Sequence, residues 1–163
     1  MKPVPPAPPF SPAWLAAMEA ALEQARAAAS RNEAPIGAVV LSPDNAVISQ
    51  GSNSPIDLND PTAHAEILAL RRAGDVLGNY RLPGCTLVVT LEPCLMCVGA
   101  AIHARVAGIV YGATDPKAGA VASQLNGAEL PFVNHRFWSV GGILEDESRE
   151  LLQTFFREKR GKA

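Results

Sequence analysis

Residues 86–111, TLVVTLEPCLMCVGAAIHARVAGIVY, carry the strongest structural signal in the chain. They open with a continuous apolar, β-branched run at 86–91, which is typical of a strand buried on both faces of a sheet. A helix is predicted at 94–103 and a second strand at 108–111. Two strands joined this closely through a helix predict a right-handed parallel crossover, and hence an α/β fold with a mixed sheet.

The residues before this segment predict a helix and a hairpin. Ser11 is a typical N-cap and Pro12 a typical first helical residue, so we expect a helix from here to about Ser30. Its apolar face is expected to carry Leu15, Met18, Leu22 and Ala25. Short β-branched runs at 36–41 and 46–50 flank the turn-forming sequence Ser-Pro-Asp-Asn, which predicts a β-hairpin.

Two further helices are expected, one before and one after the predicted crossover. A loop at 51–61 leads to a helix that Asp60 or Thr62 can cap and that ends close to Gly74. The triplet His64-Ala65-Glu66 falls in the first turn of that helix. Near the C-terminus an apolar stripe at helical spacing predicts packing against the core, and it consists of Leu151, Leu152, Phe155 and Phe156.

Length and composition indicate one globular domain. A chain of 163 residues, of which 48% are hydrophobic and 18% charged, can bury a single core. Prolines at five of the first ten positions favour an extended, disordered tail at 1–10, so we expect a single folded domain to span 11–163. No segment reaches the roughly twenty apolar residues of a membrane span, and no signal-peptide core is apparent.

Charge and cysteine content indicate the kind of partner and the cellular compartment that we expect for the protein. The formal net charge of −2 gives no general basic field, so a polyanionic partner would have to meet a local patch such as the basic run at 157–162. Three cysteines, two of them spaced as Cys94-Leu-Met-Cys97, fit a reduced compartment better than a disulfide framework. We therefore expect a cytoplasmic protein.

Two segments carry candidate metal ligands at the starts of predicted helices. One contains His64, and the other contains Cys94 and Cys97. One imidazole and two thiolates occupy three corners of a tetrahedron, a set that suits Zn²⁺, and they leave the fourth corner open for water. An open corner is typical of a catalytic rather than a structural zinc site.

Glu66, two residues after His64, is the candidate for proton transfer. Zinc lowers the pKa of its bound water to roughly 7, and a neighbouring carboxylate that is not itself a ligand can take the released proton. Taken alone, Cys-x-x-Cys is also compatible with a redox dithiol and a helical histidine with a core residue. Taken together, His-x-Glu and Pro-Cys-x-x-Cys are typical of zinc deaminases that act on cytosine or adenine.

The chain resembles the bacterial tRNA-specific adenosine deaminases, within the cytidine-deaminase-like superfamily. The likeness rests on PIGAV at 35–39, NDPTAHAEI at 59–67, NYRL at 79–82, TLEPCLMC at 90–97, NHR at 134–136 and GIL at 142–144. The resemblance implies a three-layer α/β/α fold with a five-stranded mixed sheet, one zinc ion per subunit and a homodimer. It also implies that a tRNA anticodon stem-loop is the partner and that its wobble adenosine is converted to inosine.

The same resemblance assigns three further residues to substrate binding. Asn53, in Ser-Asn-Ser-Pro, is expected to form hydrogen bonds with the flipped nucleoside, and the backbone N–H of Ala65 is expected to hold the edge of the base. Asp115 matches a position that contacts the backbone of the anticodon loop. Around it, Pro116 and Ala118 depart from the family pattern.

Two other functions are compatible with the same residues. A deaminase of free guanine or cytosine would share the ligand set, but the 79–82 segment, the 91–97 segment and the basic C-terminal helix favour tRNA. A non-catalytic zinc module that binds RNA or a protein would keep the fold without the reaction. Glu66 and the lack of an apparent fourth ligand argue against such a module.

Overall fold

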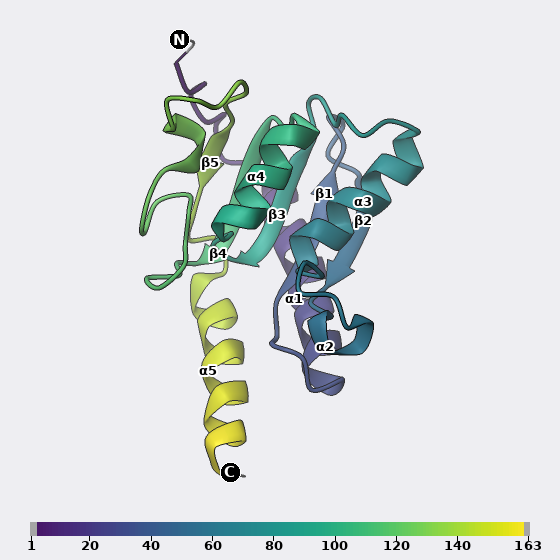
Figure 1. The fold of residues 1–163 in the computed structure, drawn as a ribbon, viewed down its shortest axis with the longest axis vertical. Helices are drawn as coiled ribbons and strands as arrows, with labels where there is room; N and C mark the ends of the chain where they lie inside the picture. The colour runs from purple at the N-terminus through teal and green to yellow at the C-terminus, as the bar shows by residue number, and fades with distance from the viewer. Residues whose placement is uncertain (1–2, 162–163) are drawn as a thin grey trace.

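The structure is a computed structural model that describes residues 3–161, and it contains one five-stranded mixed sheet (Figure 1). In spatial order the strands are β2 (Val47–Ser52), β1 (Gly37–Leu41), β3 (Thr86–Leu91), β4 (Gly108–Ala113) and β5 (Trp138–Val140). β1 runs antiparallel to β2 and β3, whereas β4 runs parallel to β3 and β5. The predicted hairpin and the predicted parallel crossover are both confirmed.

Helices cover both faces of the sheet. α1 (Pro12–Ser30) packs against one face, and α3 (Ala65–Leu77) and α4 (Leu95–Ala104) pack against the other. α2 (Pro55–Leu58) is a single turn before α3, and a 3-10 turn spans Gly127–Glu129. α5 (Glu145–Gly161) extends beyond the end of the sheet (Figure 1). This is the three-layer α/β/α arrangement that the resemblance implies.

Alternate residues of the central strands supply two apolar cores. Val39 of β1 and Val88 of β3 belong to the cluster on the α1 side, together with Trp14 and Met18. The neighbouring strand residues belong to the cluster on the side of α3 and α4: Ala38, Val40, Leu87 and Val89. Successive side chains of a strand point to opposite faces, and β3 is buried from Thr86 to Thr90 because both of its faces are covered.

α1 spans the residues predicted for it, with one error in its buried face. Ser11 caps the helix, because its Oγ accepts a hydrogen bond from the N–H of Ala13 at 3.3 Å. Three of the four predicted apolar positions are buried, but Leu15 is 39% exposed. The prediction for Leu15 is wrong because the neighbouring Trp14 packs in the core between α1 and the sheet instead.

The segment around α3 differs from the prediction at both ends. Asp60 does not cap the helix, because its carboxylate accepts hydrogen bonds from the N–H and the hydroxyl of Thr62, at 2.8 and 2.7 Å, and so closes a local turn. His64 occupies the N-cap position instead of the first turn. At the other end the helix continues past Gly74 and stops at Gly78, where glycine adopts a φ of 60° without strain.

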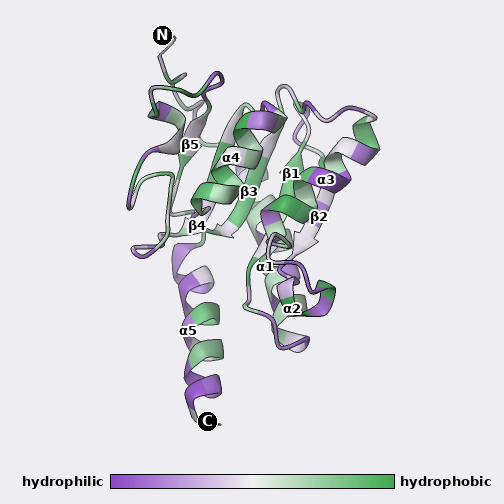
Figure 2. Ribbon diagram, in the orientation of Figure 1, coloured by the Kyte–Doolittle hydropathy of each residue, from purple (hydrophilic) through white to green (hydrophobic). Residues whose placement is uncertain are grey.

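α5 is where the predicted packing fails most. Its apolar stripe is expected in the core, yet Ser148 is the one buried residue in the described helix and Phe156 is 43% exposed. In Figure 2 the stripe appears as green patches on α5, which extends beyond the end of the sheet. Helical spacing identifies an apolar face but does not say what covers it. The predicted core packing of Phe156 is therefore wrong, and Phe155 is half-buried outside both core clusters.

Residues 3–10 form neither helix nor strand. Val4 nevertheless packs against the larger core cluster, and Phe10 makes an edge-to-face contact with Trp14. The division into a tail at 1–10, of which 1–2 lie outside the described residues, and a domain at 11–163 stays a prediction. Across residues 3–161, no helix combines the length and apolar character that crossing a membrane requires.

Candidate active site

His64, Cys94 and Cys97 come together at the N-terminal ends of α3 and α4. The Sγ atoms of Cys94 and Cys97 are 3.8 Å apart, and each lies 3.6 Å from Nδ1 of His64. Cys97 is buried, whereas His64 and Cys94 are partly exposed. The structure thus places the three nominated metal ligands in one cluster.

The starts of the two helices position these side chains. His64 and Cys94 are both N-cap residues with extended backbone, and Cys97 follows one helical turn after Cys94, on the same side of α4. Free N–H groups and the helix dipole make this end of a helix favourable for thiolates. β2 also approaches closely, since a Cβ at Gly51 would collide with the carbonyl of Ala65.

The three ligand atoms fit a tetrahedral zinc ion. Zn–S bonds of about 2.3 Å and Zn–N bonds of about 2.0–2.1 Å, at tetrahedral angles, separate two sulfurs by about 3.8 Å and sulfur from nitrogen by about 3.6 Å. The observed separations agree with both values. In the part of the chain that the structure describes, the cluster has no fourth His, Cys, Asp or Glu.

The contact between the two sulfurs shifts their pKa values in opposite directions. The hydrogen bond between the two sulfurs, together with the contact with His64, outweighs the effect of burial and lowers the pKa of Cys94 to about 4. The same hydrogen bond, followed by burial, raises the pKa of Cys97. Contact with Cys94 also raises the pKa of His64. Of the two cysteines, Cys94 therefore reaches the thiolate form more readily.

Glu66 lies in the first turn of α3, two residues after the His64 ligand position, and is 4% exposed. Burial raises the pKa of its carboxyl group, although the charge of His64 acts in the opposite direction. Glu66 is not one of the residues that form the cluster. A buried carboxyl group beside the ligand set, but outside it, has the placement that general acid–base chemistry needs.

Asn53 follows β2 and lies close to the start of α3. Its N–H donates to the carbonyl of Ile36 at 3.0 Å, and the N–H of Ser54 donates to the carbonyl of Ala63, also at 3.0 Å. Asn53 is 6% exposed, and its side-chain amide carries both hydrogen-bond donors and an acceptor. The N–H of Ala65 is one of the four at the start of a helix that have no partner within it. Both groups can therefore form hydrogen bonds with a ligand.

Asp115 lies in the loop after β4, and one of its carboxylate oxygens supports that loop. Oδ1 accepts hydrogen bonds from the N–H groups of Lys117 and Ala118, at 3.0 and 3.2 Å. Its contact with a substrate stays a prediction.

Glu92 has a structural role that the sequence analysis does not identify. It is 2% exposed, and its carboxylate accepts the hydroxyl of Ser123 and four backbone N–H groups at 2.8 to 3.1 Å, those of Asp115, Val121, Ala122 and Ser123. Burial would raise the pKa of Glu92, but these hydrogen bonds lower it to about 2. The available sequence signal is a carboxylate placed directly after a run that is predicted to be a buried strand.

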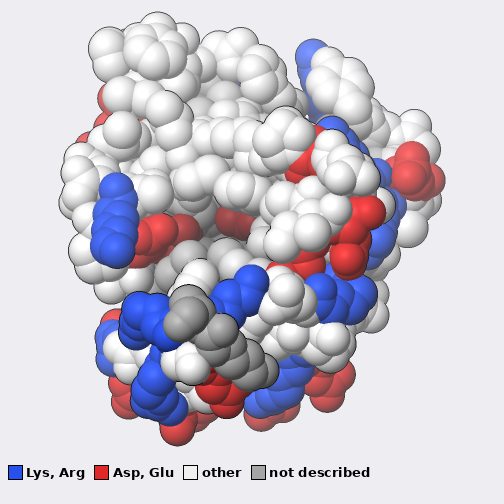
Figure 3. Space-filling view, turned by 60° about the horizontal axis from the view of Figure 1, so that its bottom comes forward, with Lys and Arg blue, Asp and Glu red and all other residues white. Residues whose placement is uncertain are grey.

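Two hollows on the surface do not contain the cluster. The larger, about 950 Å³, lies between α3 and α4, and its lining includes Ile67, Leu70, Met96 and Tyr80. The second, about 580 Å³, connects the loop after β4 with α5 and is lined by Lys117, Leu152, Gln153, Phe156, Arg157 and Arg160. Figure 3 shows lysines and arginines gathered around the end of α5.

Comparison with known proteins identifies the family. Residues 13–160 match the MafB19-like deaminase family. The chain belongs to this family. The predicted class of enzyme, a deaminase, is thereby confirmed. The deaminase is also 50% identical over 143 residues to the tRNA-specific adenosine deaminase of Agrobacterium fabrum, which covers 88% of this chain and 93% of that protein.

Two solved structures share the fold of this deaminase. One, from a study of A-to-I editing by tRNA:A34 deaminases at the wobble position of transfer RNA, has a TM-score of 0.82 and 47% identity, and the match covers 84% of this chain and 99% of that one. A guanine deaminase from Nitrosomonas europaea has a TM-score of 0.73 and 29% identity, with coverage of 94% and 86%. Both the fold class and the resemblance to tRNA-specific adenosine deaminases are confirmed.

Proposed function

We propose that this deaminase converts adenosine to inosine at the wobble position of a tRNA anticodon, with one zinc ion per subunit. The observation that carries the proposal is the cluster of His64, Cys94 and Cys97, whose ligand atoms stand at tetrahedral spacing. Three ligands without a fourth favour a catalytic site. The buried Glu66 beside them supports hydrolysis.

The reaction consumes one water molecule and needs two proton transfers. Zinc, when bound, supplies the Lewis acidity that makes water a nucleophile near neutral pH. Glu66 takes a proton from this water as the water oxygen attacks C6 of adenine, and it delivers the proton to N1. Glu66 then takes the second proton from the hydroxyl group now on C6 and delivers it to the exocyclic amine, which leaves as ammonia while C6 becomes a carbonyl. Adenosine and water thus become inosine and ammonia.

Asn53 and the N–H of Ala65 are proposed to hold the nucleoside in place. The amide of Asn53 can both donate and accept hydrogen bonds, and it is 6% exposed. Ala65 lies between the proposed metal ligand His64 and the proposed acid–base residue Glu66. A base held by the Ala65 N–H would therefore lie close to both reacting groups.

RNA binding is proposed to use a local basic surface, because the net charge of −2 attracts no polyanion. The hollow beside α5 combines Lys117, Arg157 and Arg160 with the exposed ring of Phe156. Basic side chains bind phosphates, and aromatic rings stack on unpaired bases. Asp115, two residues before Lys117, is proposed to touch the backbone of the anticodon loop.

A homodimer and a cytoplasmic location complete the proposal. Next to the hollow between α3 and α4, Val76, Leu77 and Tyr80 are 62%, 45% and 68% exposed. Clustered exposed apolar side chains are typical of protein interfaces. Sedimentation analysis should find a dimer of the unaltered chain, and Tyr80→Glu should shift it towards the monomer.

The test is an assay of the zinc-loaded protein on an anticodon stem-loop with adenosine at the wobble position, run beside free guanine, cytosine and adenosine. We expect inosine to form in the RNA alone. Glu66→Gln should lower kcat by about 10²- to 10⁴-fold while the zinc content stays at one ion per chain. Glu23→Gln, which alters an exposed glutamate of α1, is the matched control.

Other results would favour the alternatives. Turnover of free guanine with none of the RNA would favour a free-base deaminase, for which the likeness to the Nitrosomonas europaea enzyme is the specific observation. A zinc-loaded protein that turns over no substrate would favour a non-catalytic module that binds RNA or a protein.

A further inference from the structure

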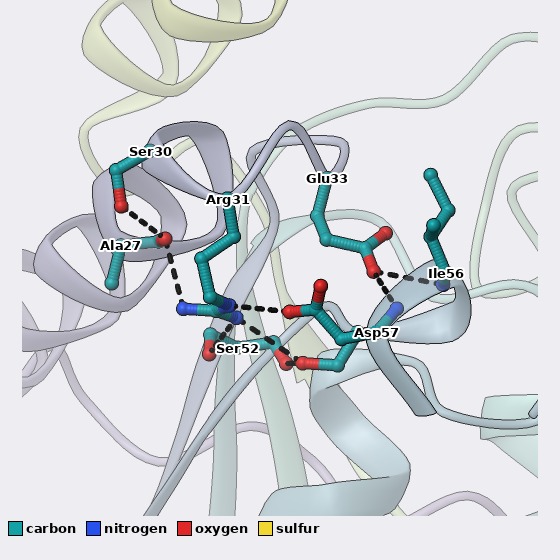
Figure 4. Close-up of polar contacts among 8 residues, drawn as sticks. Ala27, Ser30, Arg31, Glu33, Ser52, Ile56 and Asp57 are labelled. Carbon is teal, nitrogen blue, oxygen red and sulfur yellow. Dashed lines mark hydrogen bonds and ion pairs between the residues drawn. The ribbon is translucent and has the colours of Figure 1, made fainter. Parts of the chain in front are cut away.

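Arg31, the residue that follows α1, binds the two serines on either side of Asn53. Figure 4 shows its contact with the first of them, Ser52. Its Nη2 donates to Oγ of Ser52 at 2.9 Å and to Oγ of Ser54 at 3.2 Å. Oγ of Ser54 in turn donates to the carbonyl of Ser52 at 2.8 Å. The guanidinium group therefore bridges the backbone segment that carries Asn53.

The other nitrogens of Arg31 hold the guanidinium group itself in place. Nε donates to Oδ2 of Asp57 at 2.7 Å, and Nη1 donates to the carbonyl of Ala27 at 2.9 Å. The donors of a guanidinium group lie in one plane and have fixed directions, so four hydrogen bonds leave it little freedom. Arg31 thus joins the end of α1 to the end of β2 and to α2.

Glu33 anchors the far end of the same segment. It is 1% exposed, and its Oε1 accepts hydrogen bonds from the N–H groups of Ile56 and Asp57, both at 2.8 Å (Figure 4). The segment 52–57 is therefore bound by Arg31 at its start and by Glu33 at its end. Asn53 lies within the part that Arg31 bridges.

We propose that Arg31 is a positioning residue that holds Asn53 in the orientation that binds the nucleoside. This inference rests on the proposed function, in which Asn53 contacts the nucleoside. Asn53 is buried and its side chain is short, so the direction of its amide depends on the backbone that carries it. A backbone that is ordered before the substrate arrives avoids an ordering cost during binding.

A double-mutant cycle on the anticodon stem-loop tests the inference. Arg31→Ala should lower kcat/KM about tenfold in the unaltered background and less than about twofold in an Asn53→Ala background, because residues that act through one another are not additive. A loss of equal size in both backgrounds would overturn the proposal.

Two further variants separate positioning from a general loss of structure. Arg72→Ala is the matched control, because Arg72 also donates from Nη1 to β2, to the carbonyl of Gln50 at 2.6 Å, but does not bridge the segment around Asn53. It should change kcat/KM less than about twofold. Arg31→Lys should not restore kcat/KM, since one ammonium group cannot reproduce the fork of bonds to Ser52, Ser54 and Asp57. Full rescue by Lys, or an equal loss in Arg72→Ala, would contradict the proposal.

Amide hydrogen exchange tests the bridging role without any substrate. In Arg31→Ala, exchange of the N–H groups of Asn53 and Ser54 should become at least about tenfold faster, while that of α3 stays unchanged. Unchanged exchange at 53–54 would overturn the proposal. If the unaltered protein forms no inosine in the stem-loop, the proposed function fails. The exchange result still decides whether Arg31 orders the segment around Asn53.

Discussion

Two loops flank the proposed site, and each is held by one buried glutamate that uses its carboxylate differently. The loop at 52–58 depends on Glu33, one oxygen of which accepts two N–H groups. The loop at 114–123 depends on Glu92, both oxygens of which accept a total of four N–H groups and one hydroxyl.

Glu33 and Glu92 are buried to nearly the same extent, yet the two loops depend on the two carboxylates to different degrees. A glutamine can replace a glutamate where one oxygen accepts every bond, but where both oxygens accept, its NH₂ group would face other donors. The loop held by Glu92 also contacts the residues that carry the proposed metal ligand Cys94. The N–H of Ala120 donates to the carbonyl of Pro93 at 2.8 Å, and Gly119 forms a β-bridge with Cys94.

The largest effect is expected from Glu92→Gln. The amide would leave buried donors unpaired, so the free energy of unfolding at pH 7 should fall by about 2–4 kcal/mol, measured by urea denaturation. Zinc retention after dialysis should fall as well, because the loop supports the turn of Cys94. If Glu92→Gln lowers the free energy of unfolding no more than Glu33→Gln does, the proposed difference between the two loops is contradicted.

The stability that the Glu92 charge contributes should depend on pH. Its pKa is lowered from 4.5 to about 2 in the folded protein, so the unfolded state binds the proton more readily. This contribution is fully present above about pH 5 and is lost as the pH falls towards 2. The difference in unfolding free energy between the unaltered protein and Glu92→Gln should therefore shrink over that range. A difference that stays constant from pH 6 to 3 would contradict the assignment.

Replacements of Glu33 should have smaller effects. Glu33→Ala removes the acceptor of two N–H groups and should lower the free energy of unfolding by about 1–3 kcal/mol. Glu33→Gln keeps one oxygen for both donors and should cost less than about 1 kcal/mol. Urea denaturation of the two variants tests whether one oxygen of residue 33 is sufficient. Equal losses of unfolding free energy in Glu33→Gln and Glu33→Ala would contradict this interpretation.

The smallest effect on stability is expected from Asp115→Asn in the other loop. Asparagine can still accept the N–H groups of Lys117 and Ala118 through Oδ1, so the free energy of unfolding should change by less than about 0.5 kcal/mol. A proposed contact with the RNA predicts a changed KM for the stem-loop at the same time. An unchanged KM would leave Asp115 with its role in the loop alone.

Local patterns predicted the elements that local physics specifies. The cap at Ser11, the turn of the hairpin and the apolar run of β3 each depend on residues close in sequence, and all three are present. β5 has three residues and no comparable signal of its own, since pairing with β4 is what orders it as a strand. The length of α3 was underestimated because Gly74 is tolerated within a helix whose stop signal is Gly78.

The chemistry of the site follows from residue types and spacing alone. Imidazole, thiolate and carboxylate groups have the same softness and charge in any fold, so His64, Cys94, Cys97 and Glu66 could be nominated before the structure. Tertiary structure decided which groups support them. Arg31 meets Asp57 across 26 positions, and Glu92 meets Ser123 across 31. Such pairs have no periodic signature, because they form only when helices and strands from distant parts of the chain pack against one sheet. The partly exposed stripe of α5 has the same cause, since helical spacing shows an apolar face and only packing determines whether anything covers it.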